Sequence, residues 1–156
     1  MYQDNLEQAR ALYAESISLL SEVKSKNFLT YPVRRMGYAA LRQGDHVQAN
    51  AMFKESLVLN QELGHQVGVT ACVAGLAAAI GARGDKIKAV ELFGAVDSSL
   101  HVMDSPMFNT DQVEYQRDLS SVRSALDEMT FNAAWAKGHA MTLEQAVDYA
   151  MEITKS

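Results

Sequence analysis

Histidine and cysteine are the residues of this sequence whose spacing could most directly indicate metal binding or nucleophilic chemistry. The histidines His46, His65, His101 and His139 lie far apart in the chain, and none has a second ligand at the short spacing of a zinc motif. Cys72 is the only cysteine, and no neighbouring basic residue in sequence would favour its thiolate. We therefore expect surface or helix-end histidines, a packed thiol and no metal site.

The sequence also lacks the short motifs on which common catalytic sites are built. It contains no phosphate-binding Gly-Lys loop, no Gly-x-Ser-x-Gly elbow and no paired-carboxylate arrangement. We therefore predict that the chain has no catalytic residues, is not an enzyme and holds no cofactor.

Composition and charge narrow the classes of partner. The chain has 156 residues, of which 48% are hydrophobic, and this is enough apolar material for the core of one domain. Its 14 basic and 19 acidic residues give a net charge of -5, so we expect no direct binding of nucleic acid. The uncharged, Ala- and Gly-rich run at residues 67–82 is shorter than the roughly 20 apolar residues of a membrane span, and we expect a buried helix there. A single cysteine suits a reducing, cytoplasmic setting.

The composition of the chain favours helices throughout. The chain has only two prolines, is rich in Ala, Leu, Met, Glu and Gln, and shows no sustained alternation of period two. The pattern predicts an all-α fold with helices over residues 5–24, 30–43, 45–63, 66–83, 85–103, 110–127 and 129–137, followed by a last helix capped at Thr142.

An internal repeat is the main organising feature. Residues 43–53 match residues 83–93 at an offset of forty, and residues 5–13 form a third copy forty residues earlier. The three copies align Ala9, Leu12 and Tyr13 with Ala49, Met52 and Phe53 and with Ala89, Leu92 and Phe93.

The repeated unit has a physical interpretation. Gly44 and Gly84 suit the left-handed conformation that ends a helix, while Asp45 and Asp85 can accept hydrogen bonds from the free amides that begin the next helix. Each Gly-Asp pair therefore predicts a corner between two helices. Such a pair of helices cannot bury its apolar face alone, so we expect the copies to stack.

The tail beyond Asp104-Ser105-Pro106 departs from the repeat. Its first helix has apolar positions at Val113, Leu119, Val122 and Leu126. A short helix is expected to bury Phe131 and Trp135 and to end at Gly138. The last helix begins with a capping box formed by Thr142 and Gln145. We expect this tail to cap one end of the stack.

Three glycines inside the predicted helix 66–83 indicate close packing. Gly68, Gly75 and Gly81 each destabilise a helix by about 1 kcal/mol relative to Ala. We expect neighbouring helices, or the C-terminal tail, to press against this surface and compensate. A groove for a partner helix or for a second copy of the chain is the alternative.

The repeat resembles the tetratricopeptide family. The resemblance rests on Met36-Gly37, Ala49, Phe53 and Ser56 in one copy and on Leu76-Ala77, Ala89, Phe93 and Val96 in the next. It implies a right-handed superhelix of helix hairpins over residues 1–103, with a partial unit at 1–25 and full units at about 26–63 and 64–103. Residues 104–156 then form the helical cap of a single structural domain.

A second resemblance comes from three segments. Residues 91–95, 134–138 and 141–146 are similar to the C-terminal end of large bacterial regulators that join a signal-transduction ATPase to tetratricopeptide-like repeats, often with a LuxR-type DNA-binding domain. The resemblance implies that this chain is the scaffold or sensor end of such a transcriptional regulator. Because the sequence opens in the middle of a repeat, we expect a fragment of a larger protein.

The tetratricopeptide resemblance also implies a binding surface, because the first helix of each unit lines a concave groove in that family. The corresponding residues are Tyr31, Arg34, Tyr38, Leu41, Arg42, Ala71, Ala74 and Ala78. Arginine and tyrosine side chains on one face suit a carboxylate or an acidic peptide. We therefore predict a protein-interaction module that binds a protein or peptide, with a homo-oligomer as a further option. The alternative is a sensor that holds a small-molecule or peptide effector in the same groove.

Overall fold

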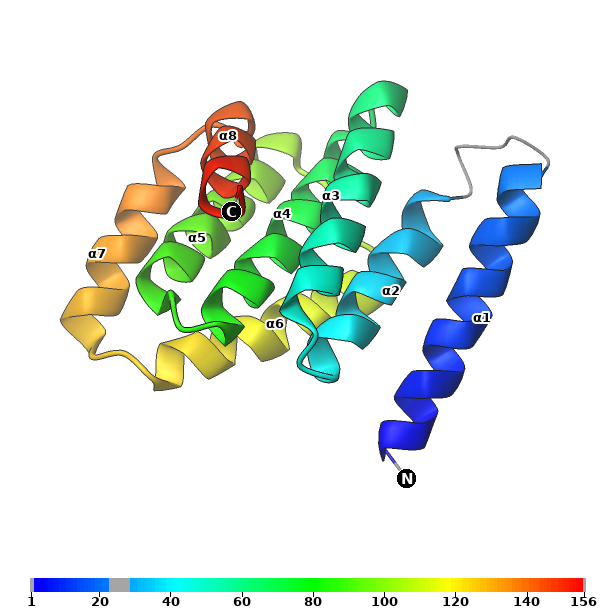
Figure 1. Cartoon of the computed structure of the whole chain (residues 1–156). Coiled ribbons are helices and arrows are strands. Elements are labelled where there is room, and N and C mark those ends of the chain that lie inside the picture. Colours follow the sequence, from blue (N-terminus) through cyan, green and yellow to red (C-terminus); the bar gives the residue numbers. More distant parts are fainter. Residues whose placement is uncertain (1, 23–28, 156) are drawn as a thin grey trace. The chain divides into compact units, whose positions relative to one another are not determined.

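The computed structural model describes residues 2–22 and 29–155 of the chain (Figure 1). Within these residues every regular element is a helix, so the all-α prediction is confirmed. The helices are α1 (Tyr2–Glu22), α2 (Thr30–Arg42), α3 (His46–Leu63), α4 (Gln66–Ala82), α5 (Lys86–Met103), α6 (Asn109–Ser124), α7 (Glu128–His139) and α8 (Leu143–Ile153). Among the described helices, none is both long enough and apolar enough to cross a membrane.

Most predicted helix boundaries agree with the structure to within two residues. The predicted helix at 5–24 runs past the described residues at its C-terminal end, since residues 23–28 lie outside them. The largest differences are at α6, which ends at Ser124 and not at residue 127, and at α1, which already begins at Tyr2. The spacing of apolar residues and breakers is therefore sufficient to place the elements.

The helices group into two compact units, Met1–Cys72 and Val73–Ser156, and α4 runs through the division. In the first unit α2 packs against both α1 and α3. The corner between α2 and α3 has the predicted form, because Gly44 takes a φ of 81° and the Asp45 carboxylate accepts a hydrogen bond of 3.1 Å from the amide of Gln48. The ring of Phe53 lies against Gly37 and makes an edge contact with Tyr38, with ring centroids 4.8 Å apart.

A buried polar cluster follows at the C-terminal end of α3. The Asn60 amide is 2% exposed and donates to the backbone oxygen of Ser56 at 2.9 Å and to the sulfur of Cys72 at 3.7 Å. The Ser56 hydroxyl donates to the backbone oxygen of Thr30 at 2.7 Å. Cys72 is buried, so the prediction of a packed thiol is confirmed.

The corner before α5 repeats the first corner only in part. Gly84 takes a φ of 117°, as predicted, but the Asp85 side chain makes no capping hydrogen bond. It pairs instead with the guanidinium of Arg83 at 3.0 Å, and the prediction of an Asp85 cap is wrong. The two corners differ because a different residue precedes the glycine in each. Arg83 offers a charged partner within reach, whereas the first copy has Gln43 at that position.

In the second unit α5 contacts α6, α7 and α8. The approach of α7 is closest, because a Cβ atom placed on Gly138 would lie 1.6 Å from the backbone oxygen of Glu91. One placed on Gly94 would lie 2.5 Å from the backbone oxygen of Trp135. The prediction that Gly138 ends its helix is therefore wrong. α7 continues to His139, and Gly138 allows two helix backbones to touch.

The buried face of α6 differs from the expected apolar one. Val113 is 66% exposed, and the buried residues of α6 are Asp111, Glu114, Tyr115, Asp118 and Val122. Only Val122 among the four expected apolar positions is buried. The buried set follows the helical spacing of three and four residues, but most of its members are polar, so hydrophobicity alone selects the wrong face.

The last helix begins as predicted. The Thr142 hydroxyl accepts a hydrogen bond of 3.1 Å from the backbone N–H of Gln145. The side-chain oxygen of Gln145 in turn accepts one of 2.9 Å from the backbone N–H of Thr142. The capping box is thus confirmed, and α8 buries Ala146, Val147 and Ala150.

Candidate functional site

The residues predicted to line a groove do not form an open surface. Six of the eight are buried: Arg34, Tyr38, Leu41, Ala71, Ala74 and Ala78. Tyr31 and Arg42 are partly exposed. The Arg34 guanidinium lies 5.7 Å from the centre of the Tyr31 ring, and that of Arg42 lies 5.9 Å from the centre of the Tyr38 ring. The structure thus pairs arginine with tyrosine along α2, and the binding role of the set stays a prediction.

The glycines of α4 meet side chains of neighbouring helices. A Cβ atom on Gly68 would lie 2.0 Å from the Asn60 side-chain oxygen, and one on Gly81 would lie 3.0 Å from Val122 and 3.1 Å from the Ala89 methyl group. For these two glycines, close packing by neighbouring helices is confirmed as the explanation.

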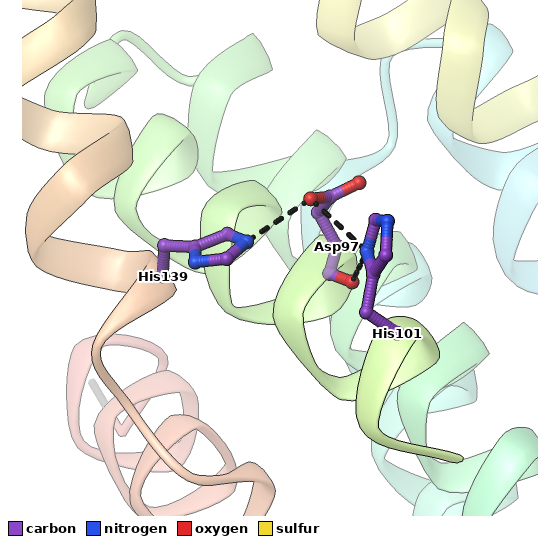
Figure 2. A group of neighbouring side chains, drawn as sticks. All are labelled: Asp97, His101 and His139. Carbon is purple, nitrogen blue, oxygen red and sulfur yellow. Dashed lines mark hydrogen bonds and ion pairs between the residues drawn. The ribbon is translucent and has the colours of Figure 1, made fainter. Parts of the chain in front are cut away.

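A different group of side chains comes together where α5 and α7 meet. Figure 2 shows the carboxylate of Asp97 between two imidazole rings, His101 from the next turn of α5 and His139 from α7. Oδ2 of Asp97 lies 3.2 Å from Nε2 of His139 and 3.5 Å from Nδ1 of His101. One ligand atom from each of the three residues lies within 4.8 Å of the others. His101 and His139, far apart in the sequence, thus lie together in the structure, and both are exposed residues near helix ends, as expected.

The cluster is open to solvent. The exposed fractions of the side chains are 31% for Asp97, 44% for His139 and 76% for His101. Nδ1 of His101 also lies 2.8 Å from the backbone oxygen of Asp97, one turn earlier in the same helix. Burial and then the negative charge of Asp97 raise the pKa of the Tyr115 hydroxyl.

Aromatic rings on α7 border the cluster on one side. The rings of Phe131, Trp135 and His139 follow one another at intervals of four residues, with centroids 5.8 Å and 6.4 Å apart. Phe131 is buried, as predicted, but Trp135 is only half-buried. It lines a wide, open depression of about 410 Å³ together with Ala136, His139 and Ala140.

A second polar group joins α5 to α7 and to α8. The buried carboxylate of Glu91 lies 3.3 Å from the Lys137 ammonium and accepts a hydrogen bond of 3.0 Å from the Tyr149 hydroxyl. Partial burial, followed by the hydrogen bond to Glu91 and the charge of Glu91, raises the pKa of Tyr149 to about 12.

Comparison of the chain with protein-family models, curated proteins and solved structures finds no match. The interpretation of this site therefore depends on its own residues. Two imidazoles and a carboxylate can share protons, form ion pairs or bind a cation.

Sequence reasoning could have found two of the three residues of this cluster. Asp97 and His101 are four residues apart, and this spacing places two side chains on one face of a helix. His139 is separated from them by most of the C-terminal tail, and no sequence signal gives the direction in which α7 crosses α5. The glycines Gly94 and Gly138 indicate close approach of helices, but they do not indicate which helices meet.

Proposed function

We propose that the chain is a helical-repeat scaffold of tetratricopeptide type that binds an amphipathic helix of a partner protein along the open face of α1. In this proposal it serves as a binding module of a bacterial transcriptional regulator and carries out no catalysis.

The common environment of the repeat positions supports the stacked architecture. Ala49 and Phe53 of α3 have no exposed surface, and neither do Ala89 and Phe93 of α5. Each pair begins one turn after a glycine with a positive φ, at Gly44 or Gly84. Two segments forty residues apart thus bury the same side chains, as expected of equivalent positions in a repeat.

The face of α1 carries the proposal for the partner. Leu12 and Leu19 are 65% and 57% exposed, and among the described side chains of α1 none is buried. The equivalent residues of α5 are Leu92 and Ser99, which are 0% and 6% exposed. The same positions of the repeat are therefore covered by neighbouring helices in one copy and open in another. Exposed leucines at helical spacing on such a face favour a helix as the occupant.

The segments that resemble bacterial regulators also have a structural role. Residues 91–95 and 134–138 meet at the crossing of α5 and α7, where Glu91 touches Gly138 and Gly94 touches Trp135. The resemblance therefore falls on residues that shape this pair of helices. This supports a shared architecture with the C-terminal ends of those regulators, and a binding role in that context.

Site-specific crosslinking tests the proposal. A photo-reactive phenylalanine analogue replaces Leu12 in one variant and Val47 in a control, since Val47 is 83% exposed in the same unit. After irradiation in a bacterial lysate, mass spectrometry identifies the captured segment, which is then synthesised. We expect capture at position 12 and an amphipathic helical sequence in the captured peptide.

Affinity then decides whether the α1 face is the binding surface. By fluorescence anisotropy, the double variant Leu12→Glu/Leu19→Glu should bind this peptide at least about tenfold more weakly, because each charge replaces an apolar contact. Val47→Glu should bind it as the unchanged chain does. Equal capture at positions 12 and 47, or a crosslink only to a second copy of the chain, would contradict the proposal.

A further inference from the structure

We propose that Asp97, His101 and His139 form a binding site for a divalent transition-metal ion of the Zn²⁺, Ni²⁺ and Cu²⁺ group. The three residues come from two helices, and the site is independent of the partner surface on α1. Imidazole is a favoured ligand of these ions, and a carboxylate adds the negative charge that the cation requires.

The distances fit such an ion after small side-chain movements. Zinc bonds to nitrogen and oxygen are about 2.0–2.2 Å long, so the ligand atoms of a tetrahedral site lie about 3.3 Å apart. The distances from Oδ2 of Asp97 to Nε2 of His139 and to Nδ1 of His101 are already 3.2 Å and 3.5 Å. The whole set lies within 4.8 Å. Only the two imidazoles need to approach each other. Both are on exposed side chains, and in binding the ion Nδ1 of His101 exchanges its contact with the backbone oxygen of Asp97 for the metal.

The helices hold the three residues in position without a metal. Asp97 and His101 lie one turn apart on α5, so their side chains share a face. His139 follows Gly138, whose lack of a side chain lets α7 lie directly against Glu91. The ion pair between Glu91 and Lys137 and the contact of Gly94 with the amide of His139 fix the same crossing. A site built on two packed helices is more exact than one built on loops.

The surroundings leave space for the remaining ligands of an ion. A metal with three protein ligands completes its coordination with water or an added group. The depression lined by Trp135, Ala136, His139 and Ala140 opens beside His139 and admits such a group. The net charge of -5 also favours the approach of a cation over that of an anion.

The alternative is a purely structural ion pair that holds α5 to α7 and binds no metal. In that case Asp97 simply pairs with whichever imidazole is protonated. The two interpretations differ in a measurable way, because an ion pair gives no saturable, selective binding of a transition metal.

Titration of the tag-free, chelator-treated chain tests the proposal. Isothermal calorimetry with Zn²⁺ and Ni²⁺ should give one equivalent bound, whereas Mg²⁺, which prefers oxygen ligands, should not bind. Trp135 is the only tryptophan and its ring centroid lies 6.4 Å from that of His139. Added Cu²⁺ should therefore quench the tryptophan fluorescence with the same one-to-one end point.

Variants assign the ligands. His101→Ala and His139→Ala should each weaken Zn²⁺ binding at least about tenfold, with a smaller loss for Asp97→Asn, which keeps an oxygen ligand. His65→Gln is the matched control, because His65 is exposed and lies in the other unit, and it should bind as the unchanged chain does. The altered histidines are exposed, so circular dichroism should show an unchanged fold.

Thermal unfolding provides a second measurement. Zn²⁺ should raise the Tm of the unchanged chain and leave that of the His101→Ala/His139→Ala variant unaltered, since binding to the folded state alone stabilises it. Undiminished binding in that double variant, an equal loss in His65→Gln, or no saturable binding to the unchanged chain would overturn the proposal. The Leu12→Glu/Leu19→Glu variant should bind Zn²⁺ normally, which separates this test from that of the partner surface.

Discussion

The main chain of Gly138 lies directly against the main chain of Glu91. A Cβ atom on Gly138 would be 1.6 Å from the Glu91 oxygen and 2.4 Å from its carbonyl carbon. Both distances are far below van der Waals contact, so α5 and α7 can lie this close only because position 138 has no side chain. The crossing carries the candidate metal ligands as well as the ion pair of Glu91 with Lys137.

Gly138→Ala should therefore be among the most destabilising single changes in the second unit. The clash is with backbone atoms, which no rotamer change relieves, so we expect a loss of about 3 kcal/mol in the free energy of unfolding. Urea denaturation followed by circular dichroism measures it. Gly44→Ala is the control, because nothing lies within 4 Å of the added methyl group and only the φ of 81° is unfavourable, at about 1 kcal/mol. Equal losses in the two variants would show that α7 is not held at this contact.

Gly68 and Asn60 should show strong coupling in the first unit. Gly68→Ala places a methyl group 2.0 Å from the Asn60 side-chain oxygen, and Asn60→Ala leaves space at the same point. Each single change should destabilise the chain. The double variant should be more stable than the sum of the two predicts, by about 1–2 kcal/mol, because the new methyl group occupies the space that the amide leaves. Additive losses in a double-mutant cycle from urea denaturation would contradict this packing.

The two Gly-Asp corners should respond differently to loss of the aspartate. Asp45→Ala removes a capping hydrogen bond to Gln48 and should lower the free energy of unfolding by about 1 kcal/mol. Asp85→Ala removes only a pairing with Arg83 near the surface, which contributes less than about 1 kcal/mol. Thermal and urea unfolding of the two variants should therefore rank Asp45→Ala as the less stable. The reverse order would place the functional cap at Asp85.

The stability of the chain should fall at high pH partly through Tyr149. Its pKa is about 12 in the folded chain and 10.0 ordinarily, so between these values the folded state keeps a proton that the unfolded state loses. The stabilisation is fully present below pH 10 and disappears as the pH rises through 12. Tyr149→Phe removes this contribution, so the difference in stability between the unchanged chain and the variant should shrink from pH 9 to pH 11.5. A constant difference in urea midpoints across that range would contradict the hydrogen bond to Glu91.

The elements were predictable because each depends on residues close in sequence. The corner at Gly44 follows from glycine's access to a positive φ, and the start of α8 follows from the reciprocal bonds of Thr142 and Gln145. The forty-residue repeat gave the equivalence of Phe53 with Phe93, and both are fully buried. Local rules failed where a neighbouring side chain competed. The Asp85 carboxylate, for example, pairs with Arg83 and makes no hydrogen bond to the first amides of α5.

The candidate site was not predictable in the same way because it depends on how helices cross. Gly138 is compatible with a helix end and with a close backbone contact, and only the position of Glu91 shows that the second applies. His139 reaches Asp97 through that contact, across a tail with no repeat to guide it. The buried carboxylate of Asp118 shows a related limit, since hydrophobic spacing does not reveal a buried face made largely of polar residues.

Glycine on both sides of the crossing also restricts the motions open to the two helices. Because main chain meets main chain at Gly94 and Gly138, no side-chain rotation at these two points can bring α5 and α7 closer together. The contact lies near the C-terminal end of α7, where the pairs of Glu91 with Lys137 and of Asp97 with His139 also join the two helices. The N-terminal half of α7 is therefore positioned by a single anchored end, and a substitution at Gly94 or Gly138 would displace the whole helix.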